Sequence, residues 1–319
     1  MARFDGPARN ESFSHTSEVL SAQGDHLPAR LWWLLGALTL AWGFNWTAMK
    51  LALAEVPPWT FRSLCLGLGS AVLFLVLRLS GQRIPWPRGQ WRRLWVLALL
   101  NITAWNMFVA FGLTMIASGR ASILGYTMPV LAVPLSVWLL GERLTPPKVL
   151  GLALGMAGLA LLLGDAYHAI GAAPLGTLLV LGAAASWALG AVLQKKYPVA
   201  MAPGPYTAWL LLLGGLPIFA GAALLEHPGT LANIGGGAIF GTAYNVFIAF
   251  AFANWAWIKL ATSVSVTVFS LSILIIPVVA VLSGVVFLGE RPGTAEIAAL
   301  ALVLAALATV LVPARGGAK

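Results

Sequence analysis

Long apolar runs separated by short polar turns make up most of the chain from residue 31 onward. A helix needs about 20 apolar residues to cross the roughly 30 Å hydrocarbon layer of a bilayer. The pattern therefore predicts an all-α polytopic membrane protein with ten transmembrane helices, at residues 31–53, 59–79, 94–115, 118–140, 147–164, 175–194, 206–225, 235–258, 263–288 and 294–312. Proline and glycine pairs such as Pro57-Pro58 and Pro292-Gly293 mark turns between these runs.

One fifteen-residue stretch occurs twice in the sequence. Residues 129–143 and 277–291 are identical at nine positions, and both copies are apolar, contain proline and end in Gly-Glu-Arg. The shift of 148 residues moves the stretch from the fourth predicted span to the ninth. Because five spans separate the copies, they cross the membrane in opposite senses. The sequence thus predicts two five-helix inverted repeats, at residues 31–164 and 175–312, a design typical of secondary transporters.

The composition agrees with a membrane protein. The 319-residue chain is 60% hydrophobic and 9% charged, with a mean hydropathy of +0.88. Residues 1–30 are polar and predict a disordered cytoplasmic tail, and residues 313–319 form a second short tail. The lone Cys65 excludes an internal disulfide and a cysteine metal cluster.

The net charge of +9 raises the question of a nucleic-acid partner, but the positions of the basic residues indicate a membrane orientation instead. With the N-terminus inside the cell, 15 of the 19 lysines and arginines lie on the cytoplasmic side, and only Lys50, Arg62, Arg120 and Arg291 lie outside. We therefore expect both termini to be cytoplasmic, the bilayer to be the partner, and no nucleic acid to bind.

The paired motifs resemble a known family. An apolar proline-containing helix closed by Gly-Glu-Arg in each half of a ten-span chain is similar to the EamA family of the drug/metabolite transporter superfamily. The resemblance covers residues 31–312 and extends to the paired positions Ile116, Ser122 and Pro129 with Val264, Ser270 and Pro277. It implies a carrier of small metabolites in the bacterial inner membrane that works by alternating access. Within the family, the length and the tryptophan-rich spans most resemble exporters of aromatic amino acids of the YddG type.

Polar and aromatic residues that share helix faces are the candidates for a substrate site. A buried amide needs a hydrogen-bond partner in lipid, so such faces should point toward other helices or water. The candidates are Trp42, Asn45, Trp46, Asn101, Trp105, Tyr126, Trp187, Gln194, Tyr244, Asn245, Asn254 and Phe269. The alternative is that they supply interhelical packing and an interfacial tryptophan belt. Pro129 and Pro277 are candidates for gating kinks, the alternative being static bends that widen a cavity.

The acidic residues Glu55, Glu142, Asp165, Glu226 and Glu290 all lie at span ends or in loops. No carboxylate or histidine lies in the middle of a span, so the sequence predicts transport without an intramembrane carboxylate relay. Glu142 and Glu290 are either gates or local partners, each pairing with the arginine that follows it or capping the next helix.

Indole and phenol rings with a few amides suit a substrate that has a flat apolar side chain and a polar head, such as an aromatic amino acid. The same rings attract cations, so a multidrug or cation exporter is the alternative. A more distant alternative is an intramembrane enzyme acting on a lipid-linked substrate, which would need clustered acids, histidines or a metal. We expect no enzyme activity, no cofactor and no metal. Small residues in the fifth and tenth spans suit close helix packing, and we expect a monomer or a weak dimer.

Overall fold

The computed structural model describes residues 29–168, 173–227, 231, 234–261 and 266–311. Within these ranges the regular structure is helical and contains no strand. The first half comprises α2 (Ala29–Leu53), α3 (Pro58–Leu79), α4 (Trp91–Ala98), the π-helix η1 (Leu99–Ala104), α5 (Trp105–Met115), α6 (Ser118–Gly125), α7 (Met128–Leu140) and α8 (Pro146–His168). The second half comprises α9 (Ala173–Lys196), α10 (Pro203–Leu225), α11 (Gly236–Ala243), the π-helix η3 (Tyr244–Phe252), α12 (Ala253–Ala261), α13 (Val266–Leu288) and α14 (Thr294–Leu311).

Seven helical segments of the described chain are long and apolar enough to cross a membrane. They correspond to α3, α4–α5, α6–α7, α8, α9, α10 and the segment from α11 into α12. Two further apolar stretches, Ile273–Leu288 and Thr294–Thr309, are shorter. Helix α2 has the length but carries Asn45 and Lys50 among four tryptophans. The helical fold is therefore confirmed, while the ten-span topology stays a prediction. Of the two predicted tails, residues 1–28 and 313–319 lie outside the described ranges.

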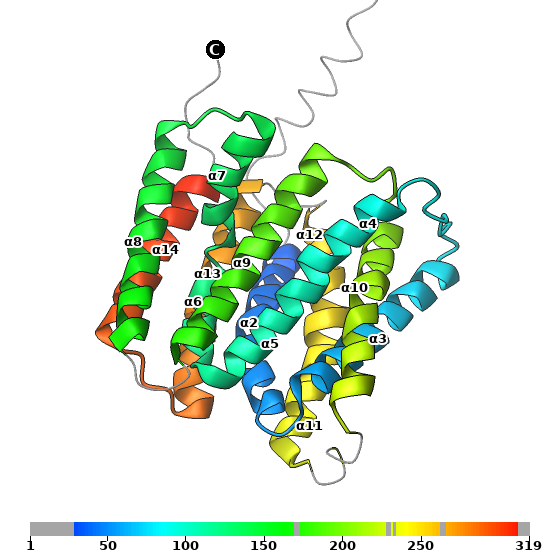
Figure 1. Cartoon of the computed structure of the whole chain (residues 1–319), viewed down its shortest axis with the longest axis horizontal. Helices are drawn as coiled ribbons and strands as arrows, with labels where there is room; N and C mark the ends of the chain where they lie inside the picture. Colours follow the sequence, from blue (N-terminus) through cyan, green and yellow to red (C-terminus); the bar gives the residue numbers. More distant parts are fainter. Residues whose placement is uncertain (1–28, 169–172, 228–230, 232–233, 262–265, 312–319) are drawn as a thin grey trace, which may run out of the picture.

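The two halves of the chain pack with matching partners. Helix α8 contacts α14 at one edge of the molecule, and α3 contacts α10 at the other (Figure 1). Between these edges, α2 contacts α11 and α13, and its counterpart α9 contacts α5 and α7. Several contacts of first-half helices thus recur with the halves exchanged, which agrees with a duplicated unit.

Local backbone features also recur in both halves. The third span contains η1 and the eighth contains η3, and such wide turns occur frequently at functional sites. In both Gly-Glu-Arg motifs the glycine follows the last helical residue and adopts a left-handed backbone conformation, with φ of +68° at Gly141 and +66° at Gly289. In each motif the glutamate N–H donates six residues back, from Glu142 to Ser136 O at 3.4 Å and from Glu290 to Gly284 O at 3.1 Å. Glycine is required there because an L side chain disfavours this φ.

The fourth span differs from the prediction. Helix α6 ends at Gly125 and α7 begins at Met128, so Pro129 lies in the first turn of a new helix and not inside a continuous one. A proline has no N–H to donate and disfavours helical geometry in the residue before it, but it is tolerated in a first turn, where the N–H needs no partner. Pro277, by contrast, lies inside α13. The kink predicted for Pro129 is therefore a break, centred on Tyr126 and Thr127.

Candidate functional site

Three aromatic side chains gather where α6 breaks. Gly125 ends α6, and a Cβ atom placed on it would lie 2.8 Å from the Trp46 ring of α2 and 3.6 Å from the Trp105 ring of α5. The next residue, Tyr126, is buried. We call Trp46, Trp105 and Tyr126 the Gly125 cluster. The missing side chain of Gly125 is what allows the two indoles to reach the break.

Further polar and aromatic contacts lie along α2, the helix that contributes Trp46 to the Gly125 cluster. The Trp42 ring packs against the Trp257 ring of α12, with centroids 5.1 Å apart. The Tyr244 hydroxyl of η3 donates to Ala41 O at 3.0 Å, which fixes the π-helix against α2. Asn45 lies one turn before Met49 on the same face, and its side-chain oxygen is buried.

Three asparagines present unpaired acceptors. The Oδ1 atoms of Asn45, Asn101 and Asn245 are all buried and have no hydrogen-bond partner among the described residues. Asn101 lies so close to Gly190 of α9 that a Cβ atom there would overlap its amide, and Asn245 Nδ2 donates to Gly241 O at 3.0 Å. An unpaired buried acceptor costs about 1–3 kcal/mol, so these oxygens suit a ligand or water that brings donors.

Four further candidates, Asn254, Trp187, Gln194 and Phe269, lie on α9, α12 and α13. Asn254 Nδ2 donates within its own segment, to Phe250 O at 2.7 Å. Trp187 is half-buried on α9, whereas Gln194 is exposed at the end of that helix, beside Lys195. The side chain of Phe269 lies outside the described residues.

The sequence interpretation assigned Arg62 to the outer interface, but the structure encloses it. Its residue is only 3% exposed, its Nη2 donates to the thioether sulfur of Met49 at 2.9 Å, and its Nε has no partner among the described residues. The signal was present in the sequence as a charged residue four positions inside the apolar run that follows Pro57-Pro58. Such residues inside a membrane span are usually functional.

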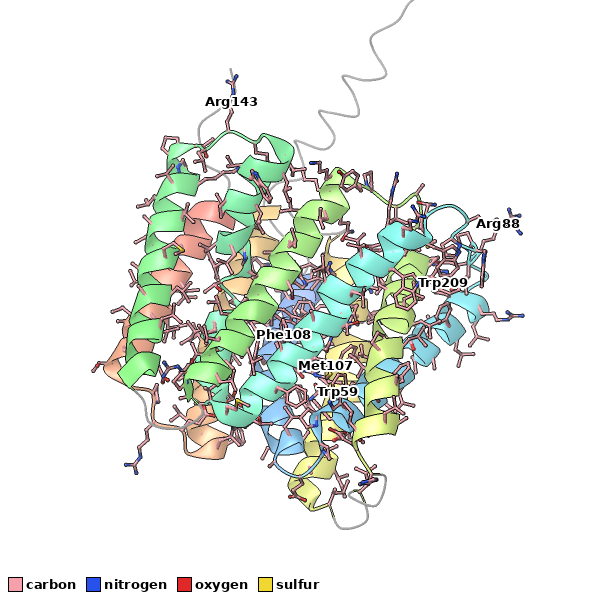
Figure 2. All side chains as sticks on the ribbon, in the orientation of Figure 1. Trp59, Arg88, Met107, Phe108, Arg143 and Trp209 are labelled. Atoms are coloured by element: carbon pink, nitrogen blue, oxygen red, sulfur yellow. The ribbon has the colours of Figure 1, made fainter. Side chains whose placement is uncertain are left out.

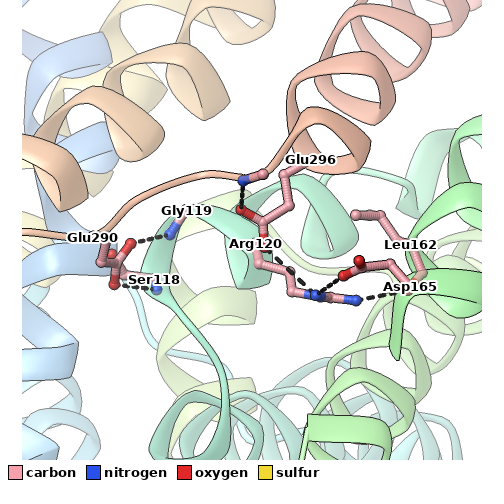
Figure 3. A network of polar contacts seen from close by, with 8 residues as sticks. Ser118, Gly119, Arg120, Leu162, Asp165, Glu290 and Glu296 are labelled. Carbon is pink, nitrogen blue, oxygen red and sulfur yellow. Dashed lines mark hydrogen bonds and ion pairs between the residues drawn. The ribbon is translucent and has the colours of Figure 1, made fainter. Parts of the chain in front are cut away.

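A polar network lies at the end of the bundle where α6 begins (Figure 3). Glu290, which follows α13, accepts from the backbone N–H groups of Ser118 at 2.6 Å and Gly119 at 3.1 Å. These are the first N–H groups of α6, whose positive end favours a carboxylate.

Two more carboxylates contact backbone N–H groups of the opposite half. Glu226 accepts from Trp59 at 3.1 Å and from Thr60 at 2.6 Å. Glu55 accepts from Gly235. We call Glu55, Glu226 and Glu290 with these N–H groups the polar seal.

Arg120 holds the same end of the bundle together beside the polar seal. Its Nη1 lies 2.6 Å from Asp165 Oδ2 and 3.5 Å from Glu296 Oε1, and its Nη2 donates to Leu162 O at 2.7 Å (Figure 3). Arg120 thereby connects the starts of α6 and α14 with the end of α8. The sequence interpretation left Glu296 out, although it lies in the first turn of α14.

Glu142 lies at the opposite end of the α6–α7 segment from Glu290. It accepts from Lys148 at 2.8 Å and Lys195 at 2.5 Å, and Arg143 points away from the bundle (Figure 2). Pairing of each glutamate with its neighbouring arginine is therefore wrong for Glu142, and Glu290 caps α6 and not the helix that follows it. The two Gly-Glu-Arg motifs thus lie at opposite ends of the bundle, as an inverted repeat requires.

The two lysines keep the Glu142 carboxylate ionised. Their hydrogen bonds, that of Lys148 first, lower the pKa of Glu142 from its ordinary value of 4.5 to about 2. Because the folded pKa is depressed, the stabilisation is complete above about pH 4.5 and is lost as the pH falls toward 2. The contact between Glu142 and its two lysines therefore persists across the physiological range.

Comparison with known proteins agrees with this geometry. The sequence pattern of the EamA-like transporter family matches the chain twice, at residues 29–164 and 174–312. The chain belongs to the EamA-like transporter family. It is therefore a multi-pass membrane transporter with a small-molecule substrate, and not an enzyme.

Several known transporters are similar to this chain in sequence. The chain is 27% identical to the uncharacterized transporter YoaV of Bacillus subtilis over 256 residues, which cover 80% of this chain and 87% of YoaV. It is 25% identical to a probable amino-acid metabolite efflux pump of Escherichia coli over 268 residues, 80% of this chain and 85% of that one. It is 30% identical to the aromatic amino acid exporter YddG of Ancylobacter novellus over 163 residues, which cover 48% of this chain and 55% of YddG. A crystal structure with 24% identity matches with a TM-score of 0.61, covers 87% of this chain and 95% of its own, and shows the same fold.

Proposed function

We propose that this transporter exports aromatic or other hydrophobic amino acids across the bacterial inner membrane by alternating access. Two observations carry the proposal: the Gly125 cluster of aromatic side chains, and the unpaired acceptors of Asn45, Asn101 and Asn245. Indole rings form a wall for a flat side chain, and amide oxygens accept from an ammonium group. The E. coli efflux pump and the Ancylobacter exporter, both amino-acid transporters by name, support the same substrate class.

We assign residues 31–164 and 175–312 to the two inverted repeats, with both termini in the cytoplasm. The polar seal and the Arg120 network then lie on the outer side, and the Glu142 contacts lie on the cytoplasmic side. We further propose that the contacts at the outer end, which link the halves through the starts of α3 and α6, hold the transporter closed to the outside. Alternating access requires these contacts to break and the symmetry-related end to close.

Transport should not depend on an intramembrane carboxylate relay. Each described acidic side chain of the bundle that forms a hydrogen bond lies at a helix end and binds a backbone N–H, a lysine or an arginine. Such carboxylates stabilise the ends of the bundle and do not lead a proton through its middle. Facilitated transport or exchange agrees best with this arrangement.

Uptake of radiolabelled phenylalanine into proteoliposomes tests the proposed substrate. We expect phenylalanine and tryptophan to enter and to compete with each other, and an imposed proton gradient to produce no accumulation. The alternative, a multidrug or cation exporter, predicts that a lipophilic cation enters and competes while the amino acids do neither. Uphill phenylalanine movement driven by the proton gradient would contradict the uncoupled mechanism.

A further inference from the structure

The guanidinium group of Arg62 is buried without an anionic partner among the described residues. No carboxylate of the described residues lies within ion-pair distance of its guanidinium group. It contacts the Met49 sulfur at 2.9 Å, and its guanidinium carbon lies 5.0 Å from the centroid of the Phe61 ring. A thioether is a weak acceptor and a ring compensates a cation only in part, so this buried charge is left largely unsatisfied.

We infer that Arg62 binds the carboxylate of the transported amino acid. This inference rests on the proposed function, because it assigns one group of that substrate to one residue. Met49 shares the α2 face with Asn45, four residues earlier, and Trp46, three residues earlier. The acceptor for the ammonium and the indole for the ring therefore lie within about one turn of Met49 on α2, and the cation for the carboxylate, on α3, contacts Met49.

The contact between Arg62 and Met49 is suited to exchange. The planar guanidinium fork matches a carboxylate in bidentate geometry, which a single sulfur atom does not. Methionine is flexible and tolerates displacement, so its sulfur can leave Arg62 when a stronger acceptor arrives. Met49 thus occupies the guanidinium in the absence of substrate, and the substrate carboxylate replaces it.

Three ligands show which chemical group of the substrate Arg62 recognises. Phenylalanine carries a ring, an ammonium and a carboxylate, phenethylamine lacks the carboxylate, and 3-phenylpropanoate lacks the ammonium. Calorimetric titration of the purified full chain in detergent should give a Kd for phenylalanine at least tenfold lower than that for phenethylamine. In Arg62→Gln, we expect phenylalanine binding to weaken on the order of 10- to 100-fold, the effect of losing a charged hydrogen bond, and phenethylamine binding to change less than twofold.

Two control variants accompany Arg62→Gln. Arg143→Gln makes the same change at an exposed arginine that points away from the bundle, and it should leave every Kd unchanged (Figure 2). Met49→Leu removes the competing sulfur but keeps the volume, and it should leave phenylalanine binding equal or tighter. Equal weakening of all three ligands in Arg62→Gln, or no weakening, overturns the inference.

If Arg62→Gln does not fold, the ligand affinities of the wild-type protein still test the inference. Equal affinity for phenylalanine and phenethylamine then overturns the inference, and a tenfold preference for phenylalanine supports it. The proposed aromatic substrate fails separately: if no phenyl compound binds but leucine does and weakens in Arg62→Lys, the role of Arg62 stands. Binding of phenethylamine without phenylalanine contradicts Arg62 as a carboxylate site and favours the cation exporter.

Discussion

Gly125→Ala is expected to reduce phenylalanine transport at least tenfold while the protein remains folded. The added methyl group would lie 2.8 Å from the Trp46 ring, closer than a carbon contact allows, so the indole must move. If Trp46 forms the wall against which the substrate ring packs, a shift of a few tenths of an ångström displaces the bound substrate, and small displacements at such sites are costly. Initial uptake rates in proteoliposomes measure the effect.

The matched control is Gly36→Ala. Gly36 lies in α2, the helix that carries Trp46, and a Cβ atom there meets nothing within 4 Å. This variant should transport at the wild-type rate. A thermal melt of both variants in detergent separates a local effect from unfolding, since overpacking is expected to lower the Tm of Gly125→Ala by only a few degrees. Wild-type transport in Gly125→Ala would mean that the substrate does not touch the Gly125 cluster.

Glu290→Ala is expected to make the end of the bundle at the start of α6 more accessible from outside. The Glu290 carboxylate accepts two hydrogen bonds from the start of α6, and a charged hydrogen bond contributes about 1.5–3 kcal/mol. If the open state lacks these bonds, their loss shifts the equilibrium toward it by at least tenfold. The reporter is Ser118→Cys in a Cys65→Ala background, because Ser118 is fully buried beneath Glu290. Its labelling rate by a membrane-impermeant thiol reagent should rise at least tenfold.

Glu142→Ala serves as the control at the opposite end of the bundle. Its carboxylate contacts only side chains of Lys148 and Lys195 in the described structure, so its loss should not raise the labelling rate of a cysteine at position 118. Equal labelling rates with and without Glu290 would show that the contact with α6 stabilises the fold without controlling access.

Much of the architecture was predictable because it depends on pattern. Apolar runs of the right length, turns at proline and glycine, and the repeated Gly-Glu-Arg motif all predict local structure directly. The left-handed φ at Gly141 and Gly289 and the matching contacts of α2 and α9 agree with the duplication that the motif predicted.

The contacts of charged groups were less predictable because they depend on residues far apart in the chain. Glu290 binds α6, some 170 residues earlier, and Glu142 binds Lys195 rather than Arg143. Arg62 is enclosed by Met49 from another helix, which a count of charges on each side of the membrane does not reveal. The break at Tyr126 arises because the matching prolines lie in different local sequences, so two copies of one motif adopt different backbone paths.

Cysteine labelling after the two Gly-Glu-Arg motifs tests the inverted arrangement most directly. Arg143→Cys and Arg291→Cys, each in the Cys65→Ala background, place single thiols at exposed positions. In intact cells an impermeant reagent should label position 291 and leave position 143 unlabelled, and inside-out vesicles should reverse the result. Labelling of both positions from the same side of the membrane would contradict the inverted repeat, and with it the proposed carrier mechanism.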